Sequence, residues 1–186
     1  MHWMSLCGSL RKESYNRKLL NVATTILKEK KIQTVEFPET VYQIPHINED
    51  LEKQGIPIDV LDLGKLVTEA QAIVIATPEY NHNFPGHLKT FVDWISRIKP
   101  AMPWKNKPVV LLSASPSMAG GNQGLWNFRI SLENLGAFVY PEMFSLAVAH
   151  KAFKEDGTLS DEKTNQRLEA LMDGYLKYVK ALNPPK

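Results

Sequence analysis

Residues 7–16, CGSLRKESYN, place hydroxyl, amide and guanidinium groups directly after a short apolar run and before the expected start of a helix. The free N–H groups and the dipole of a helix N-terminus favour an anion. Ser9, Ser14 and Asn16 can donate hydrogen bonds to phosphate oxygens, and Arg11 can add a forked charged contact. We therefore expect a terminal phosphate to bind here without a metal. Alternatively, Ser14 or Asn16 only caps the helix, although this would not explain Ser9 and Arg11.

Other phosphate-binding patterns are missing from the sequence. A cysteine-dependent phosphatase needs Cys-x5-Arg, but Glu13 stands where that arginine would follow Cys7. The chain has neither G-x-x-x-x-G-K-[ST] nor G-x-G-x-x-G, so ordinary triphosphate and dinucleotide modes lose support. H-E-x-x-H is also missing, and we expect no metal site. Cys7 is interpreted as a small core residue rather than a nucleophile.

Two further stretches carry unusual residues. In TPEYNHNFPG, residues 77–86, two prolines stiffen a loop whose aromatic and amide side chains suit the edge of a flat heteroaromatic ring. His82 in this loop could touch substrate or lie in solvent. In SASPSMAGG, residues 113–121, small side chains with Gly120 and Gly121 would let backbone approach a planar ligand closely. The third stretch alone is a weak signal.

The elements that must position these stretches follow from hydrophobic patterning. We expect strands at residues 2–7, 32–37, 72–76 and 108–113, and a fifth that begins within 137–140. Helices are expected over about 16–30, 59–71, 87–98, 123–135 and 161–180, the last with Ser160 as its N-cap. Residues 38–57 are expected to form a loop. Trp94 and Trp126 could face the core or a second subunit.

Five alternations of strand and helix predict an α/β fold, with a parallel sheet and helices on both faces. All three unusual stretches follow strands, and ligands of such folds bind beyond the carboxyl ends of strands. No second core or linker is visible, so residues 1–186 are expected to form a single domain.

Composition narrows the class of protein. The 186 residues carry a net charge of +2, without the basic stripe of a nucleic-acid binder. No apolar run is long enough to span a membrane, and the N-terminus does not resemble a signal peptide. One cysteine cannot form an internal disulfide. We expect a cytoplasmic protein with no membrane or nucleic-acid partner.

The segments GSLRKESYNRKLL, TPEYNHNFPGHLKTFVDW and SASPSMAGG, in that order, resemble the NADPH-dependent FMN reductase family. This family includes bacterial quinone and chromate reductases and azoreductase-like flavoproteins. The resemblance covers nearly the whole chain. It implies a flavodoxin-like fold with a five-stranded parallel sheet in the order 2-1-3-4-5, non-covalent FMN, and a homodimer or homotetramer. Two departures are the polar first strand, MHWMSLC, and the pair Asn83 and Phe84 where Ser and a smaller aliphatic residue are common.

The resemblance also implies cofactor-binding residues in all three stretches. Those for the flavin phosphate are Ser9, Arg11, Ser14 and Asn16. Those along the ribityl chain and the ring are Pro78, Glu79, Tyr80 and Asn81, and those flanking the isoalloxazine are Ser115, Gly120 and Gly121. Backbone N–H groups near Glu79–Asn81 are expected to face the pyrimidine end, where negative charge develops.

The implied function is an FMN-dependent NAD(P)H oxidoreductase that passes electrons to a small acceptor: a quinone, an azo compound, free flavin or a metal oxyanion such as chromate. Because the flavin carries the chemistry, no catalytic side chain is expected. The sequence does not distinguish NADPH from NADH. One alternative is a flavodoxin-like electron carrier without its own NAD(P)H activity, although carriers are usually acidic. Another is a nucleotide-binding module that holds something other than flavin.

Overall fold

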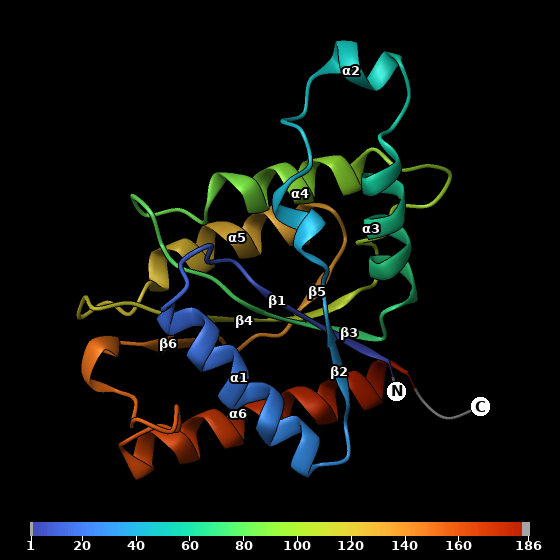
Figure 1. Cartoon of the computed structure of the whole chain (residues 1–186). Coiled ribbons are helices and arrows are strands. Elements are labelled where there is room, and N and C mark those ends of the chain that lie inside the picture. Colours follow the sequence, from blue (N-terminus) through green and yellow to red (C-terminus); the bar gives the residue numbers. More distant parts are fainter. Residues whose placement is uncertain (1, 184–186) are drawn as a thin grey trace.

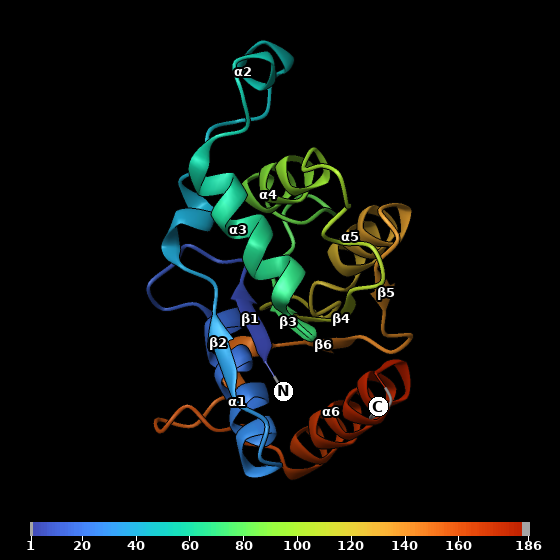
Figure 2. The same cartoon turned by 90° about the vertical axis from the view of Figure 1, so that its right-hand side faces the viewer.

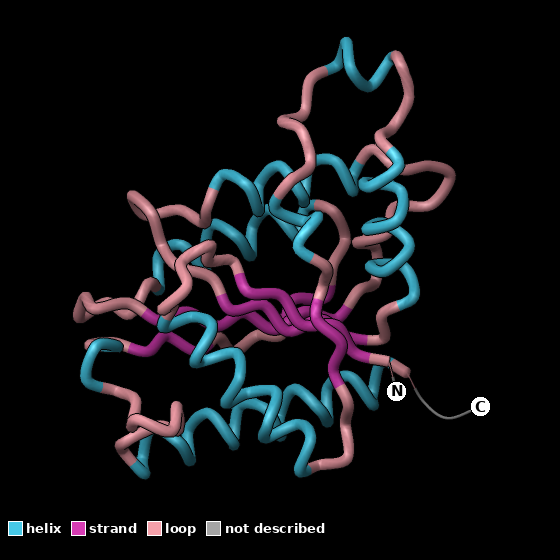
Figure 3. Tube along the Cα trace, viewed as in Figure 1, coloured by secondary structure: helices cyan, strands magenta, loops and turns pink. Residues whose placement is uncertain are grey.

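A twisted parallel sheet forms the centre of the computed structural model, which describes residues 2–183 (Figures 1 and 3). The strands are β1 (Trp3–Cys7), β2 (Thr34–Glu36), β3 (Ala72–Ala76), β4 (Pro108–Ala114), β5 (Phe138–Val139) and β6 (Phe144–Leu146). Their order is β2-β1-β3-β4-β5, and β6 also pairs with β4. The predicted flavodoxin-like order is therefore confirmed.

The fifth position of the sheet is divided between two short strands. β5 pairs with the start of β4, and β6 pairs in parallel with the end of β4. Pro141 lies between them and has no N–H to offer to a neighbouring strand. The guanidinium of Arg129 covers this gap, since it donates to the carbonyl oxygens of Tyr140 at 3.1 Å and Pro141 at 3.0 Å.

Helices cover both faces of the sheet, as predicted. α1 (Tyr15–Glu29) and α6 (Glu162–Leu182) lie on one face, and α3 (Ile58–Glu69), α4 (Gly86–Ser96) and α5 (Asn122–Asn134) lie on the other (Figures 1 and 2). A short 3₁₀ helix, η2 (Ala149–Lys151), precedes α6. Every residue of β1, β3 and β4 is buried, because side chains of successive residues enter the two separate hydrophobic cores. No helix within residues 2–183 is long and apolar enough to cross a bilayer.

The first strand is fully buried despite its polar composition. Trp3 is inaccessible to solvent and its ring meets that of Tyr175 on α6 edge to face, with centroids 5.3 Å apart. Such aromatic pairs add to the free energy gained by burial. Cys7 is also fully buried, as its interpretation as a core residue predicted, and burial raises the pKa of its thiol.

Two local predictions were wrong. Residues 38–57 are not one irregular loop, because they contain the 3₁₀ helix η1 (Glu39–Tyr42) and the helix α2 (Glu49–Lys53). Ser160 does not cap α6: the carboxylate of Asp161 accepts the N–H of Thr164 at 2.8 Å, while the hydroxyl of Ser160 donates to the carbonyl of Lys151. Asp161 is thus the N-cap, one residue later.

Trp94 and Trp126 have different surroundings. Trp94 is fully buried in the core, and its Nε1 donates to the carbonyl of Pro45 at 2.7 Å. Trp126 remains 48% exposed on α5. The prediction of a single domain over residues 1–186 stays a prediction, although both cores pack against the same sheet.

Candidate functional site

A cavity lies at the carboxyl ends of β1, β3 and β4, where the three unusual stretches of sequence meet. Its lining consists of Ser9, Arg11, Ser14, Tyr15, Asn16, Pro78, Glu79, Tyr80, Ala114, Ser115 and Pro116. All predicted site residues line this cavity except Asn81, Gly120 and Gly121. Residues that are far apart in the sequence are therefore brought together as the positions of the strand ends predicted.

The start of α1 supplies one wall. Ser14 is the N-cap, and its Oγ accepts the N–H of Arg17 at 3.2 Å. The Oγ of Ser9 accepts the N–H of Arg11 at 3.4 Å. A hydroxyl that accepts one hydrogen bond still has its own hydrogen to donate. Ser14 can thus cap the helix and donate to an anion, so the two interpretations of this residue are compatible.

Arg11 is the charged group of this wall. Its guanidinium lies over the ring of Tyr15, 5.8 Å from the centroid, and has no ion-pair partner among residues 2–183. Arg17 differs, because its guanidinium pairs with the carboxylate of Glu36 on β2. An arginine without a carboxylate partner beside two free hydroxyl hydrogens is a donor set that fits a phosphate. These residues therefore fit the phosphate end of FMN.

Asn16 is buried and holds the first and third stretches together. Its carboxamide binds both the N–H and the C=O of Ala114. One Nδ2 hydrogen remains beyond these two bonds. The structure thus places Asn16 at the cavity wall but commits most of its hydrogen-bonding capacity to Ala114.

The second stretch is a tight hairpin. Tyr80 and Asn83 exchange two backbone hydrogen bonds, of 2.8 and 3.0 Å, and Asn81 and His82 between them have φ of 51° and 62°. Positive φ at both central residues is the signature of a type I′ turn. The N–H of Tyr80 is therefore committed to Asn83, which corrects the expectation that all N–H groups near Glu79–Asn81 could face a ligand.

Glu79 fixes this hairpin against α5. Its Oε2 accepts the N–H of Gly124, in the first turn of α5, at 2.8 Å. Gly121, the N-cap, has no side chain to accept this N–H, so the carboxylate takes that role and faces the positive end of the helix dipole. His82 lies in solvent with its side chain 81% exposed, 3.6 Å from the other oxygen of Glu79.

Gly120 and Gly121 shape the turn before α5 instead of lining the cavity. Their φ values are 64° and 84°, and a Cβ on Gly120 would lie 2.9 Å from the backbone N of Ala147. The hydroxyl of Ser113 donates to the carbonyl of Gly120 at 2.7 Å. Glycine is therefore required here for backbone conformation and space.

Two residues that sequence analysis did not assign to the site contact the backbone at the end of β1, next to the cavity-lining Ser9. The hydroxyl of Tyr42 donates to the carbonyl of Cys7, and Nε2 of His87 lies 3.1 Å from the carbonyl oxygen of Gly8. Their rings meet edge to face, with centroids 5.5 Å apart. Burial lowers the pKa of His87 and raises that of Tyr42, so both are neutral near pH 7. Tyr42 falls in the segment expected to be a loop, and His87 is the first residue of the helix expected over 87–98.

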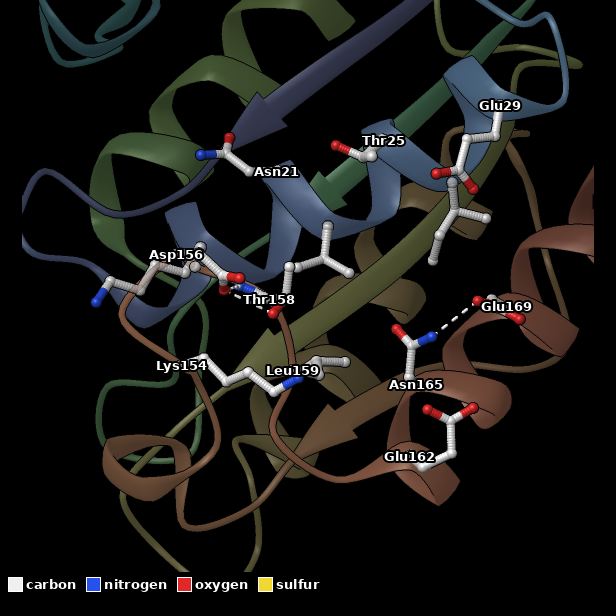
Figure 4. A pocket seen from close by; sticks show the side chains of 14 residues that line it. Asn21, Thr25, Glu29, Lys154, Asp156, Thr158, Leu159, Glu162, Asn165 and Glu169 are labelled. Carbon is white, nitrogen blue, oxygen red and sulfur yellow. Dashed lines mark hydrogen bonds between the residues drawn. The ribbon is translucent and has the colours of Figure 1, made fainter.

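A larger cavity lies elsewhere. It has a volume of about 550 Å³ and is lined by α1, α6 and the segment 154–159 (Figure 4). It shares no lining residue with the predicted site. Asn165 donates to Glu169 on its wall, as the dashed line in Figure 4 shows. No group of three or more His, Cys, Asp or Glu within residues 2–183 could hold a metal ion.

Comparison with known proteins gives consistent results. Residues 1–151 match the model of the family described as NADPH-dependent FMN reductase. An NAD(P)H:quinone oxidoreductase from Solanum tuberosum is 37% identical, with 90% of this chain and 87% of the relative covered. A quinone reductase from Escherichia coli is 30% identical over 95% and 94% of the two chains. The structure of a flavoenzyme NAD(P)H:(acceptor) oxidoreductase from Paracoccus denitrificans superposes with a TM-score of 0.83 and 27% identity, covering 97% of each chain.

Proposed function

This chain belongs to the NADPH-dependent FMN reductase family and is an FMN-dependent NAD(P)H oxidoreductase, for which we propose a quinone as the electron acceptor. The relatives from Solanum tuberosum and Escherichia coli, both named for quinone reduction, support this choice of acceptor. The alternative of an electron carrier without NAD(P)H activity is not favoured, because the matched family and these relatives are reductases.

The observation that carries the proposal is the cavity shared by three strand ends. We propose that Ser9, Arg11 and Ser14 hold the phosphate of FMN, and that Asn16 donates its remaining hydrogen there. The ribityl chain and ring would then extend over the hairpin formed by Pro78–Asn81, with Ser115 on the opposite side. Gly120 and Gly121 contribute by shaping the turn that presents Ser115 and α5.

When bound, FMN supplies the hydride and electron transfer chemistry. The chain's own residues bind and orient it. The N–H of Asn81 makes no hydrogen bond within residues 2–183, so we propose it as the donor to the pyrimidine end of the ring. Tyr80, which is 52% exposed, and Met118, which is 84% exposed, leave apolar surface on the two loops beside the cavity. This surface suits a planar, weakly polar acceptor better than a chromate ion.

We also propose a homodimer or homotetramer. Trp126 and Ile130 of α5 are 48% and 64% exposed, and large apolar side chains gathered on one helix are typical of subunit contacts. Ile130 also lines a cavity of about 480 Å³, together with Phe84 and Lys89. A cytoplasmic location is proposed as well, because the single cysteine is a free, buried thiol suited to a reducing compartment.

The decisive experiment is anaerobic reduction of the purified, FMN-loaded protein. We expect a yellow protein that is bleached by NADPH or NADH and is reoxidised at once by a benzoquinone or naphthoquinone. Chromate, an azo dye and free FMN are tested as the other acceptors in the same assay. Colour without bleaching would overturn the reductase assignment, and reoxidation by chromate faster than by every quinone would overturn the proposed acceptor.

A further inference from the structure

We propose that His87, together with Tyr42, positions the backbone of residues 7–9, here called the phosphate-binding turn, so that the N–H of Ser9 points at the phosphate of FMN. The inference rests on the proposed function, since it concerns the same site. It assigns a role to two side chains that do not line the cavity themselves.

The hydrogen-bond partner of His87 shows which of its ring nitrogens carries the hydrogen. Its Nε2 lies 3.1 Å from the carbonyl oxygen of Gly8, and a carbonyl oxygen can only accept. Nε2 must therefore carry the hydrogen and donate. Tyr42 donates in the same way to the preceding carbonyl, that of Cys7. The two successive peptide groups at the end of β1 are thus each held at their carbonyl oxygen, by two side chains whose rings are in contact.

A trans peptide fixes where the opposite group must point, since its C=O and N–H are antiparallel. The carbonyl of Gly8 faces His87 on α4, so the N–H of Ser9 faces away from α4. α1 lies on the other face of the sheet from α4 (Figures 1 and 2). The N–H of Ser9 is therefore directed toward the face where Ser14 begins α1, and both serines line the cavity.

The preceding peptide, between Cys7 and Gly8, has the same antiparallel arrangement of C=O and N–H. The carbonyl of Cys7 faces Tyr42, and the N–H of Gly8 in that peptide donates in another direction, to Ala76 of β3 at 2.7 Å. By contrast, the N–H of Ser9 has no hydrogen-bond acceptor within residues 2–183, although Ser9 is only 7% exposed. A buried N–H without a partner is costly, and a phosphate oxygen would satisfy it.

The turn has little room to adopt another orientation. A Cβ on Gly8 would lie 2.5 Å from Oγ1 of Thr77 and 2.6 Å from Cδ1 of Leu88, so the backbone is in close contact with the residue after β3 and with α4. The ring of His87 is held in place by its edge-to-face contact with the ring of Tyr42. His87 is thus a positioning residue, which acts on the phosphate through the peptide between Gly8 and Ser9.

The test compares FMN with riboflavin, which lacks the phosphate. Apo-protein is titrated with each flavin, and quenching of flavin fluorescence gives the two dissociation constants. His87→Phe keeps an aromatic ring against Tyr42 but removes the donor. We expect FMN to bind about tenfold more weakly and riboflavin to bind unchanged, since only the phosphate contacts the N–H of Ser9. His87→Gln retains an N–H donor and is expected to recover most of the affinity.

The control is His46→Phe, because His46 contacts Thr90 Oγ1 at 3.3 Å and does not touch the turn. Equal weakening of both flavins, or no weakening of FMN, in His87→Phe would overturn the inference. If His87→Phe fails to fold, Tyr42→Phe, which loses only a hydroxyl, must show the same selective loss for FMN, and its absence overturns the proposal. A wild-type protein that does not prefer FMN to riboflavin would instead sink the proposed function.

Discussion

The carboxamide of Asn16 binds both backbone polar groups of Ala114, a residue 98 positions later in the chain. Nδ2 donates to the carbonyl oxygen at 3.0 Å, and Oδ1 accepts the N–H at 2.8 Å. One side chain in the first turn of α1 therefore satisfies both backbone polar groups of the last residue of β4. This contact holds the first of the three unusual stretches, residues 7–16, against the third, residues 113–121.

Asn16→Ala is expected to lower the free energy of unfolding by about 2–4 kcal/mol, because two buried backbone groups lose their partners. FMN affinity should fall as well, since both walls of the cavity are released. Urea unfolding of the apo-protein measures the first effect, and flavin fluorescence measures the second. Asn21→Ala, an exposed asparagine on the same helix, serves as the control. Equal stability of the two variants would show that the contact with Ala114 is not stabilising.

Arg11→Ala is expected to weaken FMN binding by about 10- to 100-fold while leaving riboflavin binding unchanged, because a charged contact to the phosphate is lost. The remaining FMN affinity should also depend less on salt concentration. Lys12→Ala is a matched control: Lys12 is the next residue, is exposed and carries the same charge, but does not line the cavity. Calorimetric titration at two salt concentrations distinguishes the variants. If Lys12→Ala loses as much affinity as Arg11→Ala, general electrostatic attraction explains the effect.

Glu79→Ala removes the acceptor of the Gly124 N–H and should destabilise the protein by about 1 kcal/mol, as loss of an N-cap does. Glu79→Gln retains an oxygen that can accept this N–H. It should therefore lose less stability than Glu79→Ala, and only because the negative charge near the positive end of the helix dipole is missing. Thermal unfolding of both apo-proteins gives the order of stability. A glutamine variant as unstable as the alanine variant would mean that charge, and not the hydrogen bond, fixes the hairpin to α5.

Lys107 makes stability depend on pH. Its buried ammonium donates to the carbonyls of Thr68 and Ala70 at the end of α3, and burial lowers its pKa from 10.5 to about 8. Between pH 8 and 10 the unfolded chain therefore binds more protons at this group than the folded protein does. The contribution of Lys107 to the free energy of unfolding thus rises with pH across this window.

The measurement is urea unfolding of the wild type and Lys107→Met at pH 7.5, 8.5 and 9.5. The free energy of unfolding of the wild type, relative to that of Lys107→Met, should rise as the pH increases. Lys105→Met, at an exposed neighbour, is the matched control. A constant difference for Lys107→Met would mean that the two carbonyls keep the ammonium charged throughout the range.

Sequence patterns predicted the parts of the fold that depend on local composition. The uninterrupted apolar runs AIVIA and PVVLLS marked β3 and β4 to within one residue, because strands buried on both faces need apolar side chains at every position. The division of β5 from β6 was not predicted, since it depends on how Arg129 covers the gap around Pro141. η1 and α2 are too short to show periodicity.

In the site, too, local features were predicted and contacts between distant residues were not. The types and positions of Ser9, Arg11 and Ser14 pointed to an anion at a helix start, because that signal is local. The hydrogen bonds by which Glu79 and Asn16 hold the site together involve partners 45 and 98 residues away. No pattern within one stretch of sequence indicates such a partner, and the same holds for the support that His87 gives to Gly8.

α2 protrudes at one end of the molecule and has no fully buried residue, and only its Leu51 packs against the core (Figure 1). An ion pair between Glu52 and Arg97 on the exposed surface ties it back to the end of α4. Surface segments of this kind tolerate insertion, shortening and cleavage at small thermodynamic cost. An affinity tag or a fluorescent reporter inserted between Gln54 and Gly55, which are exposed, would thus leave the proposed flavin-binding residues unaltered, so that flavin occupancy could still be followed by colour.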